Sequence, residues 1–501
     1  AYTPVGITGY LRVGVIPADT DGVEGGVVYS PNSVALSDQI VFYVAPDAPA
    51  DGNGSYKAPF ATPEAARDAI RDLKSKGILS GGATVYFRGG EYYRDTTFTL
   101  TAEDSGTPDA PITYRAYPGE KVSFTGGKRV PLSKVTGVTD SKITDRVIDP
   151  VAKAKLMQID LNGLVDEIPE IPEYSHLNDA NGTAGNLFTS QMQIYVNGQA
   201  LQRSRWPNDR ELVITKSDGK KDAPSTFSYE DSEDRARLWS SDALGDLFAE
   251  GHFVYHWTYG TFRAGALDAE NKSVTLKNAQ GNYGPTTGGS FYFRNLIEEI
   301  DIPGESYVDT QKKIVYFYPF VDMSDAEVII PVAQATLLSV NGASNIIVQG
   351  MDFEYVRNRT FELVNCNNVT VDGCGFRHFT RTNAVAGSNN IFRNNDVYDG
   401  AAGGIGVSGG DINSLNGGQN LIENNRLDSP NTLKMAYAPA LSISGVSQMI
   451  KNNEICNSAH ELISLSGNNH KILYNEIHHG AQWTGDMGAV YWGRTPLSVG
   501  Y

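Results

Sequence analysis

The amino-acid sequence predicts an all-β protein: a right-handed parallel β-helix with an N-terminal capping helix and an inserted or appended antiparallel β domain. Two observations predict it. Glycine accounts for 52 of 501 residues, and Asn, Asp, Ser and Thr separate short Val, Ile and Phe runs, which is typical of chains with many turns. In addition, six segments of the C-terminal half repeat one pattern every 21 to 30 residues, which indicates stacked coils.

The N-terminal region divides into a small upstream β segment, residues 1–40, and a capped start of the β-helix, residues 41–127. A helix is expected over 63–76, because Thr62 is a good N-cap, Pro63 suits the first helical position and Gly77 is a stop signal. The strand-like runs 84–87, 98–100, 112–117 and 122–127 follow it. We therefore expect the helix to cover the first coil, whose edge would otherwise be open.

The coil rhythm stops between residues 128 and 335, which we interpret as an inserted β-rich domain. Strand pieces alternate there with polar loops, among them MQIYV (192–196), HFVYHW (252–257), SVTL (273–276) and IVYFYP (314–319). Residues 336–501 are expected to hold the main coils and the site, and the coil pattern predicts a further strand beyond their C-terminal end.

The repeat itself predicts the register of the coils. Two apolar columns flank a position occupied by Asn395, Asn425, Asn453 and Asn475 in the last four segments. Parallel strands stacked about 4.8 Å apart would align these side chains into an inward hydrogen-bonded ladder. The apolar columns are Val348, Val371, Phe392, Ile422, Ile450 and Ile472 before the Asn position, and Phe353, Phe376, Val397, Leu427, Ile455 and Ile477 after it.

Charge and composition exclude several function classes. The formal net charge of −17 would repel nucleic acid and anionic membranes, and no run of about 18 apolar residues predicts membrane insertion. The three cysteines form no Cys-x-x-Cys pair, which argues against a disulfide framework and a structural zinc site. No dinucleotide or Walker motif is present, so no cofactor is expected. No catalytic metal site is expected either, and the sequence leaves open whether a structural cation is bound.

Several long motifs resemble the parallel β-helix glycoside hydrolases, a group that includes lacto-N-biosidase-type and fucosidase- or xylanase-type enzymes. The resemblance covers about residues 41–501 and implies a secreted or cell-surface enzyme with a carbohydrate substrate. The motifs are FYVAPDAPADGNGSYKAPFATPEAARDAIR (42–71), AEDSGTPDAPITYRAYPGEKVSFTGG (102–127), VNGQALQRSRWPN (196–208), NLIEEIDIPGESYVD (295–309), VSGGD (407–411), SGNNHKILYNEIH (466–478) and TGDMGAVYWGR (484–494).

Glycoside hydrolysis uses two carboxyl groups across the sugar. Aligning the second strand of each coil on its terminal glycine stacks Asp486 over His460, and the resemblance makes Asp486 the first catalytic candidate. His460 could orient Asp486 or be structural, Glu461 would point the opposite way if its strand has begun, and Asp411 follows two glycines in a turn. We expect the second carboxylate of a retaining pair on the following coil, in a further C-terminal segment or another chain.

Aromatic and cationic side chains near Asp486 are candidates for sugar binding: Trp483, Tyr491, Trp492 and Arg494. Trp206 and Trp257 could be platforms or core residues. The pair His478–His479 has no carboxylate at ligand spacing in the sequence and is interpreted as solvated.

Two rival functions stay open. A polysaccharide lyase would use a Lys or Arg base, for which Lys434 and Arg494 are candidates, whereas a non-catalytic β-helix protein would bind glycan and leave it intact. The sugar, its linkage and the oligomeric state do not follow from the sequence.

Overall fold

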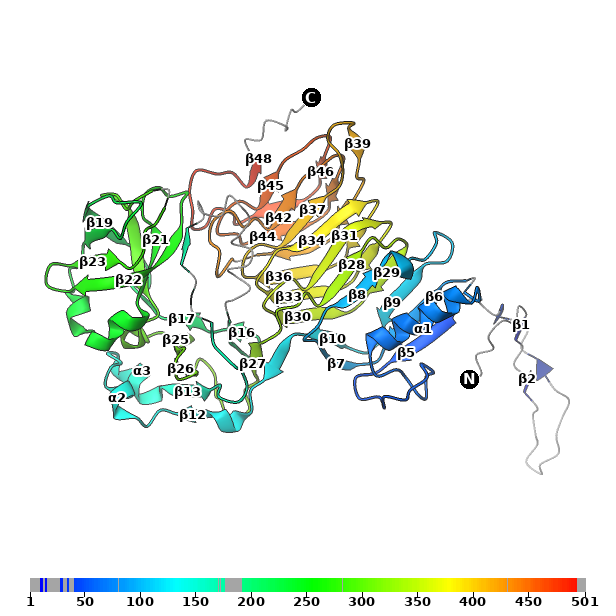
Figure 1. The fold of residues 1–501 in the computed structure, drawn as a ribbon, viewed down its shortest axis with the longest axis horizontal. Coiled ribbons are helices and arrows are strands. Elements are labelled where there is room, and N and C mark those ends of the chain that lie inside the picture. The colour runs from blue at the N-terminus through cyan, green and yellow to red at the C-terminus, as the bar shows by residue number, and fades with distance from the viewer. Residues whose placement is uncertain are drawn as a thin grey trace.

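The computed structural model describes residues 40–492 except 80, 170, 172, 176–191, 282 and 430, together with four short strands before residue 40. Its C-terminal half and residues 40–125 build one parallel β-helix, which rises from helix α1 (Pro63–Ser75) to the last strand (Figure 1). The predicted fold class is confirmed. The four early strands pair antiparallel: β1 (Tyr10–Leu11) with β4 (Val34–Ala35), and β2 (Gly14–Val15) with β3 (Val28–Tyr29).

Three parallel sheets form the sides of the β-helix within the described residues. Sheet 1 contains β5 (Ile40–Val44), β6 (Ala83–Phe87), β9 (Ile112–Ala116), β29 (Ile346–Gln349), β32 (Thr370–Asp372), β35 (Ile391–Arg393), β40 (Leu421–Glu423), β43 (Met449–Lys451) and β46 (Lys471–Leu473). Sheet 2 contains β7 (Gly90–Tyr93), β10 (Val122–Thr125), β30 (Asp352–Val356), β33 (Gly375–Phe379), β36 (Asp396–Gly400), β41 (Arg426–Asp428), β44 (Glu454–Cys456) and β47 (Glu476–His478). Sheet 3 contains β8 (Phe98–Thr101), β28 (Leu338–Asn341), β31 (Phe361–Asn367), β34 (Asn383–Ser388), β37 (Ile405–Ser408), β42 (Leu441–Ile443), β45 (Ile463–Leu465) and β48 (Val490–Trp492).

Helix α1 begins at Pro63 as the sequence predicts and ends one residue earlier than predicted, at Ser75. The Thr62 hydroxyl accepts a hydrogen bond from the Ala65 amide at 3.2 Å, and Gly77 follows the helix with φ +67°. Ala66 and Ile70 are buried in the same core as Val44 of β5. The helix therefore covers the first coil of the β-helix (Figure 1).

The two predicted apolar columns are confirmed by the strand register, from Val348 to Ile472 in sheet 1 and from Phe353 to Ile477 in sheet 2. They belong to different sheets, however, because each repeat bends at a corner rather than continuing as one strand. At that corner Asn394, Asn424 and Asn452 have φ between +55° and +57°, a conformation that Asn tolerates better than most residues.

The asparagine ladder occupies this corner. The Asn425 side-chain oxygen accepts from the Asn395 amide at 2.9 Å, and the Asn425 Nδ2 donates to Asn453 Oδ1 at 2.9 Å. Asn453 repeats both bonds with Asn475. A second ladder of Asn390, Asn420 and Gln448, absent from the sequence-based prediction, lies at the corner between sheets 3 and 1.

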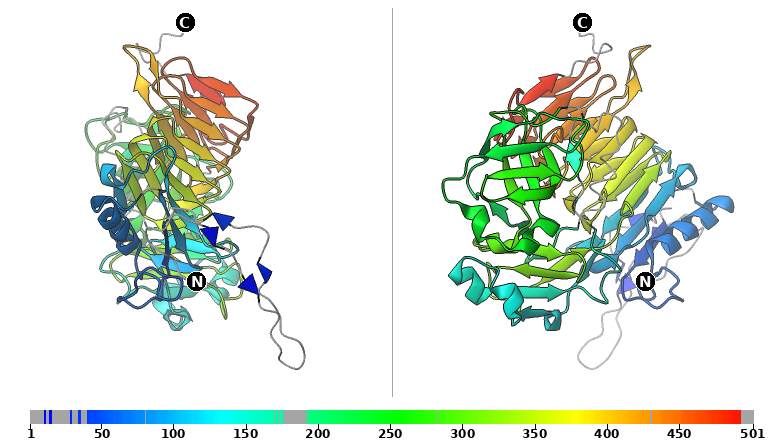
Figure 2. Two further views of the ribbon diagram at one scale, coloured as in Figure 1. Left: turned by 90° about the vertical axis from the view of Figure 1, so that its right-hand side faces the viewer. Right: turned by 60° about the vertical axis from the view of Figure 1, so that its left-hand side comes forward.

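An insertion of antiparallel strands leaves the β-helix after β10 and returns before β28, since β10 pairs directly with β30. It holds the short helices α2 (Ser141–Thr144) and α3 (Pro150–Lys155) and lies beside the β-helix (Figure 2). Its first two sheets contain β11 (Gly127–Arg129), β27 (Val328–Pro331), β15 (Tyr195–Val196) and β16 (Gln199–Ala200), and β12 (Val135–Gly137), β13 (Met157–Asp160), β26 (Ile314–Phe317), β25 (Glu305–Asp309) and β17 (Gln202–Arg203). The largest contains β14 (Tyr174–Ser175), β22 (Gly260–Asp268), β21 (Phe248–His252), β24 (Ser290–Arg294), β19 (Leu212–Ser217), β20 (Thr226–Tyr229) and β23 (Ser273–Leu276), with β18 (Arg205–Trp206) paired to β24.

Two predicted strands of the insertion are shorter than expected. Of 192–196 only Tyr195 and Val196 are in a strand, and of 252–257 only His252 is. The turn at 255–258 is closed by Thr258, whose amide and hydroxyl both donate to the Tyr255 carbonyl at 2.9 Å. Among the described residues no helix has the length and apolar character needed to cross a membrane.

Candidate active site

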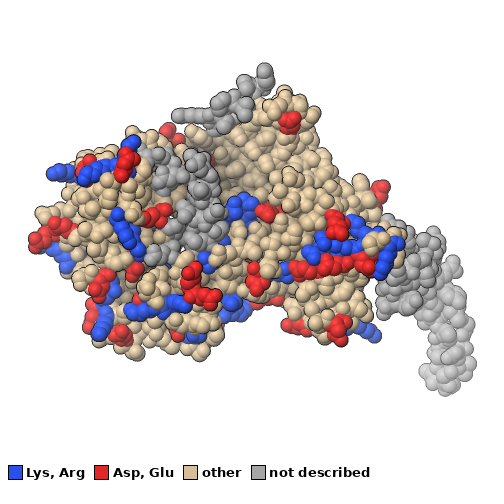
Figure 3. All heavy atoms as spheres, in the orientation of Figure 1, with Lys and Arg blue, Asp and Glu red and all other residues tan. Residues whose placement is uncertain are grey.

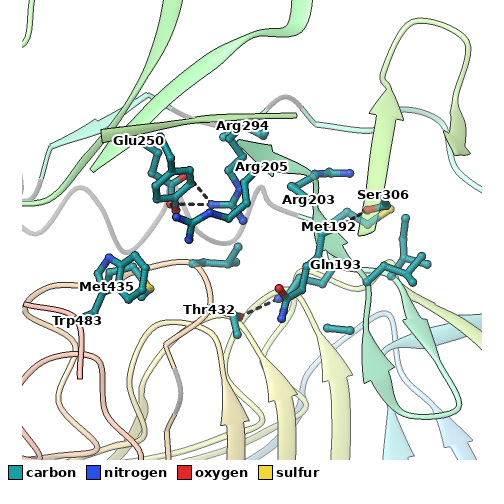
Figure 4. Close-up of a pocket in the computed structure, with 17 residues that line it drawn as sticks. Met192, Gln193, Arg203, Arg205, Glu250, Arg294, Ser306, Thr432, Met435 and Trp483 are labelled. Carbon is teal, nitrogen blue, oxygen red and sulfur yellow. Dashed lines mark hydrogen bonds and ion pairs between the residues drawn. The ribbon is translucent and has the colours of Figure 1, made fainter. Parts of the chain in front are cut away.

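A cavity of about 240 Å³ lies between the insertion and the β-helix, and is called here the seam cavity (Figure 4). The β-helix contributes loops that follow sheet 2, and the insertion contributes strands of its two larger sheets. The lining residues are Ile171, Met192, Gln193, Ile194, Ala200, Leu201, Gln202, Arg203, Arg205, Glu250, Tyr292, Arg294 and Ser306 from the insertion, and Thr432, Leu433, Met435 and Trp483 from the β-helix.

The wall on the insertion side is held by the buried carboxylate of Glu250. It accepts hydrogen bonds from Arg294 Nη1 at 2.5 and 2.7 Å, from Tyr292 Oη at 2.8 Å and from Tyr259 Oη at 2.7 Å. Burial raises the pKa of the Tyr292 phenol. With all its neighbours donating to it, Glu250 is suited to fixing the wall rather than to delivering a proton.

Arg205 connects the two walls of the cavity. Its guanidinium carbon lies 3.7 Å from the centre of the Tyr292 ring and 5.4 Å from that of the Trp483 ring. Its Nε and Nη2 donate to the carbonyls of Pro207 and Arg210 at 2.8 and 2.9 Å. A cation between two aromatic rings presents flat apolar faces together with hydrogen-bond donors, a combination that suits sugar rings and their hydroxyls.

Asp486 lies on an exposed turn next to this cavity, with φ +59°. The turn is fixed at its base, because the amides of Trp483 and Thr484 donate to the Ala459 carbonyl at 3.1 Å. It is also fixed to the insertion, because the Gly485 amide donates to the His256 carbonyl at 2.8 Å. The carboxyl group of Asp486 is thus exposed to solvent where the two parts of the chain meet.

The insertion brings an aromatic group to the same place. Tyr255 and Trp257 flank His256 on one loop, and their rings stack with centres 5.5 Å apart and an angle of 4° between planes. The Tyr283 ring meets Trp257 edge-on at 6.3 Å. Trp257, one of the tryptophans that the sequence left open, therefore lies in a half-exposed cluster beside the Asp486 turn.

Behind this loop, His252 is buried and its Nδ1 lies 3.1 Å from both carboxyl oxygens of Glu211. Burial favours the neutral form of Glu211, but its hydrogen bonds with His252 and Ser290 outweigh burial and lower the pKa of this carboxyl. The His252 ring lies 5.3 Å from that of His256. His252 and Glu211 therefore pack behind the aromatic loop and contact it at His256.

The predicted stacking of Asp486 over His460 is wrong by one residue. Sheet 3 pairs Ile463 with Val490, whereas the glycine-based alignment placed Ala489 there. The reason is that Gly467 follows Ile463 by four residues whereas Gly493 follows Val490 by three, so the two glycines used for the alignment are not equivalent. Asp486 nevertheless lies in the loop that folds over residues 459–463.

Glu461 does not point away from His460, because β45 begins only at Ile463. Both side chains are buried, and the Glu461 carboxylate forms an ion pair with His460 Nδ1. The His460 ring also packs on Tyr437, with centres 4.7 Å apart. The pair lies beneath the loop that carries Asp486 rather than at the surface.

Other predicted residues lie elsewhere. Asp411 is exposed in the hairpin of β38 (Gly410–Asp411) and β39 (Asn416–Gly417), where its carboxylate accepts from the Asn413 amide at 2.9 Å and the Ser414 hydroxyl at 2.8 Å. These bonds lower the pKa of Asp411, as in a turn-forming residue.

Tyr491 and Trp492 are successive residues of β48 and therefore face opposite sides of sheet 3, so they form no common platform. Arg494 lies outside the described residues. Trp206 is a core residue, buried against Trp239 and Phe293.

A wider, open pocket of about 650 Å³ continues from the seam cavity, and the two share Gln193, Ala200, Gln202 and Thr432. Its floor is a column of Tyr355, His378 and Asp399, each with φ between +52° and +55°. The rings of Tyr355 and His378 stack with centres 4.4 Å apart. Burial, and then the neighbouring Arg377, lower the pKa of His378 to about 3, so this imidazole is neutral.

The sequence analysis missed most of the cavity wall. Arg205, Tyr292 and Glu250 come from three strands of the insertion and reach Trp483 only through the tertiary fold. A sequence signal existed for one of them, because Arg205 lies in the motif VNGQALQRSRWPN on which the family resemblance rests. Glu250 and Tyr292 carry no such signal.

No family model matches the chain. An 84-residue stretch is 36% identical to pectate lyase PEL9 of Emericella nidulans, and the match covers 17% of this chain and 18% of that protein, less than a fifth of its length. In structure, the chain is similar to a protein described as a glycoside hydrolase, with a TM-score of 0.51 and 15% identity over 90% of this chain and 96% of the other. A structure of XylC with xylose gives a TM-score of 0.43 at 13% identity, over 88% and 64%. The first of these structures shares the fold of this chain.

Proposed function

We propose that this chain is a glycoside hydrolase that binds an oligo- or polysaccharide along the seam between the β-helix and the insertion. The observation that carries the proposal is the position of Asp486, an exposed carboxyl group fixed between the aromatic loop at 255–257 and the Trp483 wall of the seam cavity. Sugar-processing sites need a carboxyl group beside flat apolar surfaces and hydrogen-bond donors, and these three elements converge here.

In this proposal Asp486 contacts the sugar and acts as one of the two catalytic carboxyl groups. Glu461 and His460 are positioning residues, because they are buried beneath the loop of Asp486 and paired with each other. Arg205 and Trp483 hold a sugar ring, and the open pocket at His378 receives further units of the chain. A retaining mechanism would place the second carboxyl group about 5–5.5 Å from Asp486.

A polysaccharide lyase is the second candidate. It is favoured by the local identity to a pectate lyase and by Lys434, which lies between Leu433 and Met435 of the cavity lining. A lyase removes a proton next to a uronate carboxyl group, so a Lys base at this position would suit that reaction. We also propose that the protein works outside the cell, where polymeric glycans are available.

Product analysis on a panel of neutral and uronate-containing glycans separates these functions. We expect new reducing ends without ultraviolet absorbance, which is the product of hydrolysis. Products with a conjugated double bond, and their loss in Lys434→Gln but not in Asp486→Asn, would identify a lyase. Saturable binding of a glycan that stays intact would identify a binding protein and refute both enzymes.

A further inference from the structure

Glu454, Cys456 and His478 lie together on the outer face of sheet 2, away from the groups that line the seam cavity. Glu454 and Cys456 are two residues apart on β44, so their side chains project from the same face. The register places His478 of β47 beside Cys456. One ligand atom from each residue lies within 4.8 Å of the other two, and among the described residues no other trio of His, Cys, Asp or Glu meets this condition.

The burial of the three residues fits an ion site that opens to solvent. Cys456 is 1% exposed and forms the floor, whereas the side chains of Glu454 and His478 are 41% and 31% exposed and form the rim. His478 Nε2 lies 3.4 Å from Glu454 Oε1 and 4.0 Å from Glu476 Oε1, so this nitrogen faces the cluster. Its Nδ1 contacts His479 instead.

The charges around the thiol also favour a cation. The neighbouring carboxylates are Asp428, Glu454 and Glu476, and the nearby cation Arg426 is bonded to Asp428 at 2.8 Å and lies 3.7 Å from Glu454. Arg426 also interacts with the Cys456 thiol, but the three carboxylates outnumber this single cation, so the charge around the thiol is negative in sum. A divalent ion would offset this excess of negative charge.

We propose that Glu454, Cys456 and His478 bind a divalent transition-metal ion of the zinc type. A thiolate, an imidazole nitrogen and a carboxylate oxygen form a ligand set that Zn²⁺ prefers, whereas Ca²⁺ and Mg²⁺ take oxygen ligands. The thiol loses its proton to solvent on binding, and the fourth position of the tetrahedron is left for water. Ligand atoms around Zn²⁺ lie about 3.5 Å apart, so rotations that move the side chains by about 1 Å close the site.

The ion would join strands of two successive coils near the C-terminal end of the described β-helix. The sequence alone gives His478–His479 no ligand partners at metal-site spacing, because Glu454 and Cys456 lie more than 20 residues upstream and reach His478 only through the coil repeat. The inference does not depend on the proposed function, since these residues are not part of the seam cavity.

Titration of the metal-free, phosphine-reduced full chain with Co²⁺ tests the proposal. We expect one ion per chain, a thiolate-to-cobalt charge-transfer band in the near ultraviolet and intense visible bands of tetrahedral Co²⁺, all abolished by Zn²⁺. Cys456→Ser should remove the charge-transfer band and weaken binding by at least about 100-fold. Zn²⁺ should raise the melting temperature of the wild-type protein but not of this variant.

Cys366→Ser is the matched control, because Cys366 is equally buried and its thiol donates to the Val340 carbonyl, so the cobalt spectrum should persist. If Cys456→Ser fails to fold, His478→Gln changes a rim residue and should still weaken binding. Absence of saturable binding, a spectrum without the thiolate band, or an unchanged spectrum in Cys456→Ser or His478→Gln would overturn the proposal.

Discussion

At the scale of single residues, backbone conformation decides which side chains face the seam. Asp486, His378 and Asp399 all have φ between +52° and +59°, a region that costs most residues free energy and that Asn and Asp tolerate better. His378 and Asp399 lie one residue before the ends of β33 and β36, and the sheet pairing skips both of them. Asp486 lies in a loop before β48, as is usual where a rigid scaffold carries functional loops.

Asp486→Asn should lower activity by about 10²- to 10⁴-fold if the carboxyl group acts in proton transfer or attack. The melting temperature should change little, because Asp486 is exposed and Asn suits φ +59° at least as well. Steady-state rates on the glycan identified by the panel, with thermal melts, measure both. Asp411→Asn, in a hairpin turn, should reduce activity much less, and wild-type rates in Asp486→Asn would remove Asp486 from the mechanism.

His378 should make the protein less stable in acid. Its pKa is lowered to about 3 in the folded chain, whereas a histidine in the unfolded chain titrates near 6.5. Below pH 6.5 only the unfolded state takes up this proton, so the contribution of His378 is complete above pH 6.5 and is lost as the pH falls toward 3. The expected loss is on the order of 2 kcal/mol between pH 6.5 and 4.5.

Urea unfolding at a series of pH values measures this effect. His378→Asn keeps a residue that tolerates φ +54°. It should reduce the slope of the free energy of unfolding against pH by the equivalent of about one bound proton. The same slope in both proteins would show that His378 is protonated in the folded state.

At the scale of the elements, buried amides at the corners set the spacing of the coils. The inner members of the ladder, Asn425 and Asn453, each bond one Asn above and one below, so backbone and side-chain groups that the corner removes from water are satisfied. The apolar columns bury side chains but discriminate little between one register of neighbouring coils and another. The ladder therefore fixes which residue of one coil meets which residue of the next.

Asn425→Leu should lower the free energy of unfolding by on the order of 1–3 kcal/mol, because Leu keeps the branched shape but leaves the backbone amide of Asn395 without its acceptor and removes the side-chain donor of Asn453 Oδ1. Denaturant unfolding measures the loss. Asn475→Leu should cost less, since Asn475 is half-buried and water can replace part of its bonds. Equal costs at both positions would contradict the dependence on burial.

The elements differ in how far the sequence predicts them. Periodic coils are predictable because one residue pattern recurs, so the columns from Val348 to Ile472 and the Asn ladder are confirmed in register. The prediction fails at β48, because Gly493 is not equivalent to the glycines of the earlier coils and the alignment of Asp486 is therefore shifted by one residue. It fails again at 253–257, where aromatic residues typical of a strand form the loop beside Asp486.

At the scale of the whole molecule, the site depends on two parts of the chain whose contacts differ in sequence separation. The β-helix repeats locally, whereas the insertion brings distant segments together, so no single stretch of sequence contains the cavity. Acidic and basic side chains are mixed over the insertion, and the upper β-helix shows few charges in the same view (Figure 3). The net charge of −17 is therefore unevenly distributed, with few charged side chains on this face of the upper β-helix.

If a glycan binds in the seam, it should protect both parts of the molecule at once. The Gly485 amide donates to the His256 carbonyl across the seam, so local opening of the seam exposes this amide. The amides of Trp483 and Thr484, which donate to Ala459, hold the same turn on the β-helix side. A ligand that contacts both walls disfavours this opening. We expect slower hydrogen exchange at 481–487 and at 253–258 in the presence of glycan, and no change in the 410–417 hairpin.

Trp483→Ala should abolish this shared protection while leaving exchange in the coils at 346–428 unchanged, because Trp483 lines the cavity and lies outside the apolar core of the β-helix. Loss of protection at both segments would show that one ligand joins them. Protection of 410–417 alone would instead place the glycan on the outer face near Asp411. Protection of 481–487 without 253–258 would mean that the β-helix binds the sugar by itself and that the insertion plays no part in recognition.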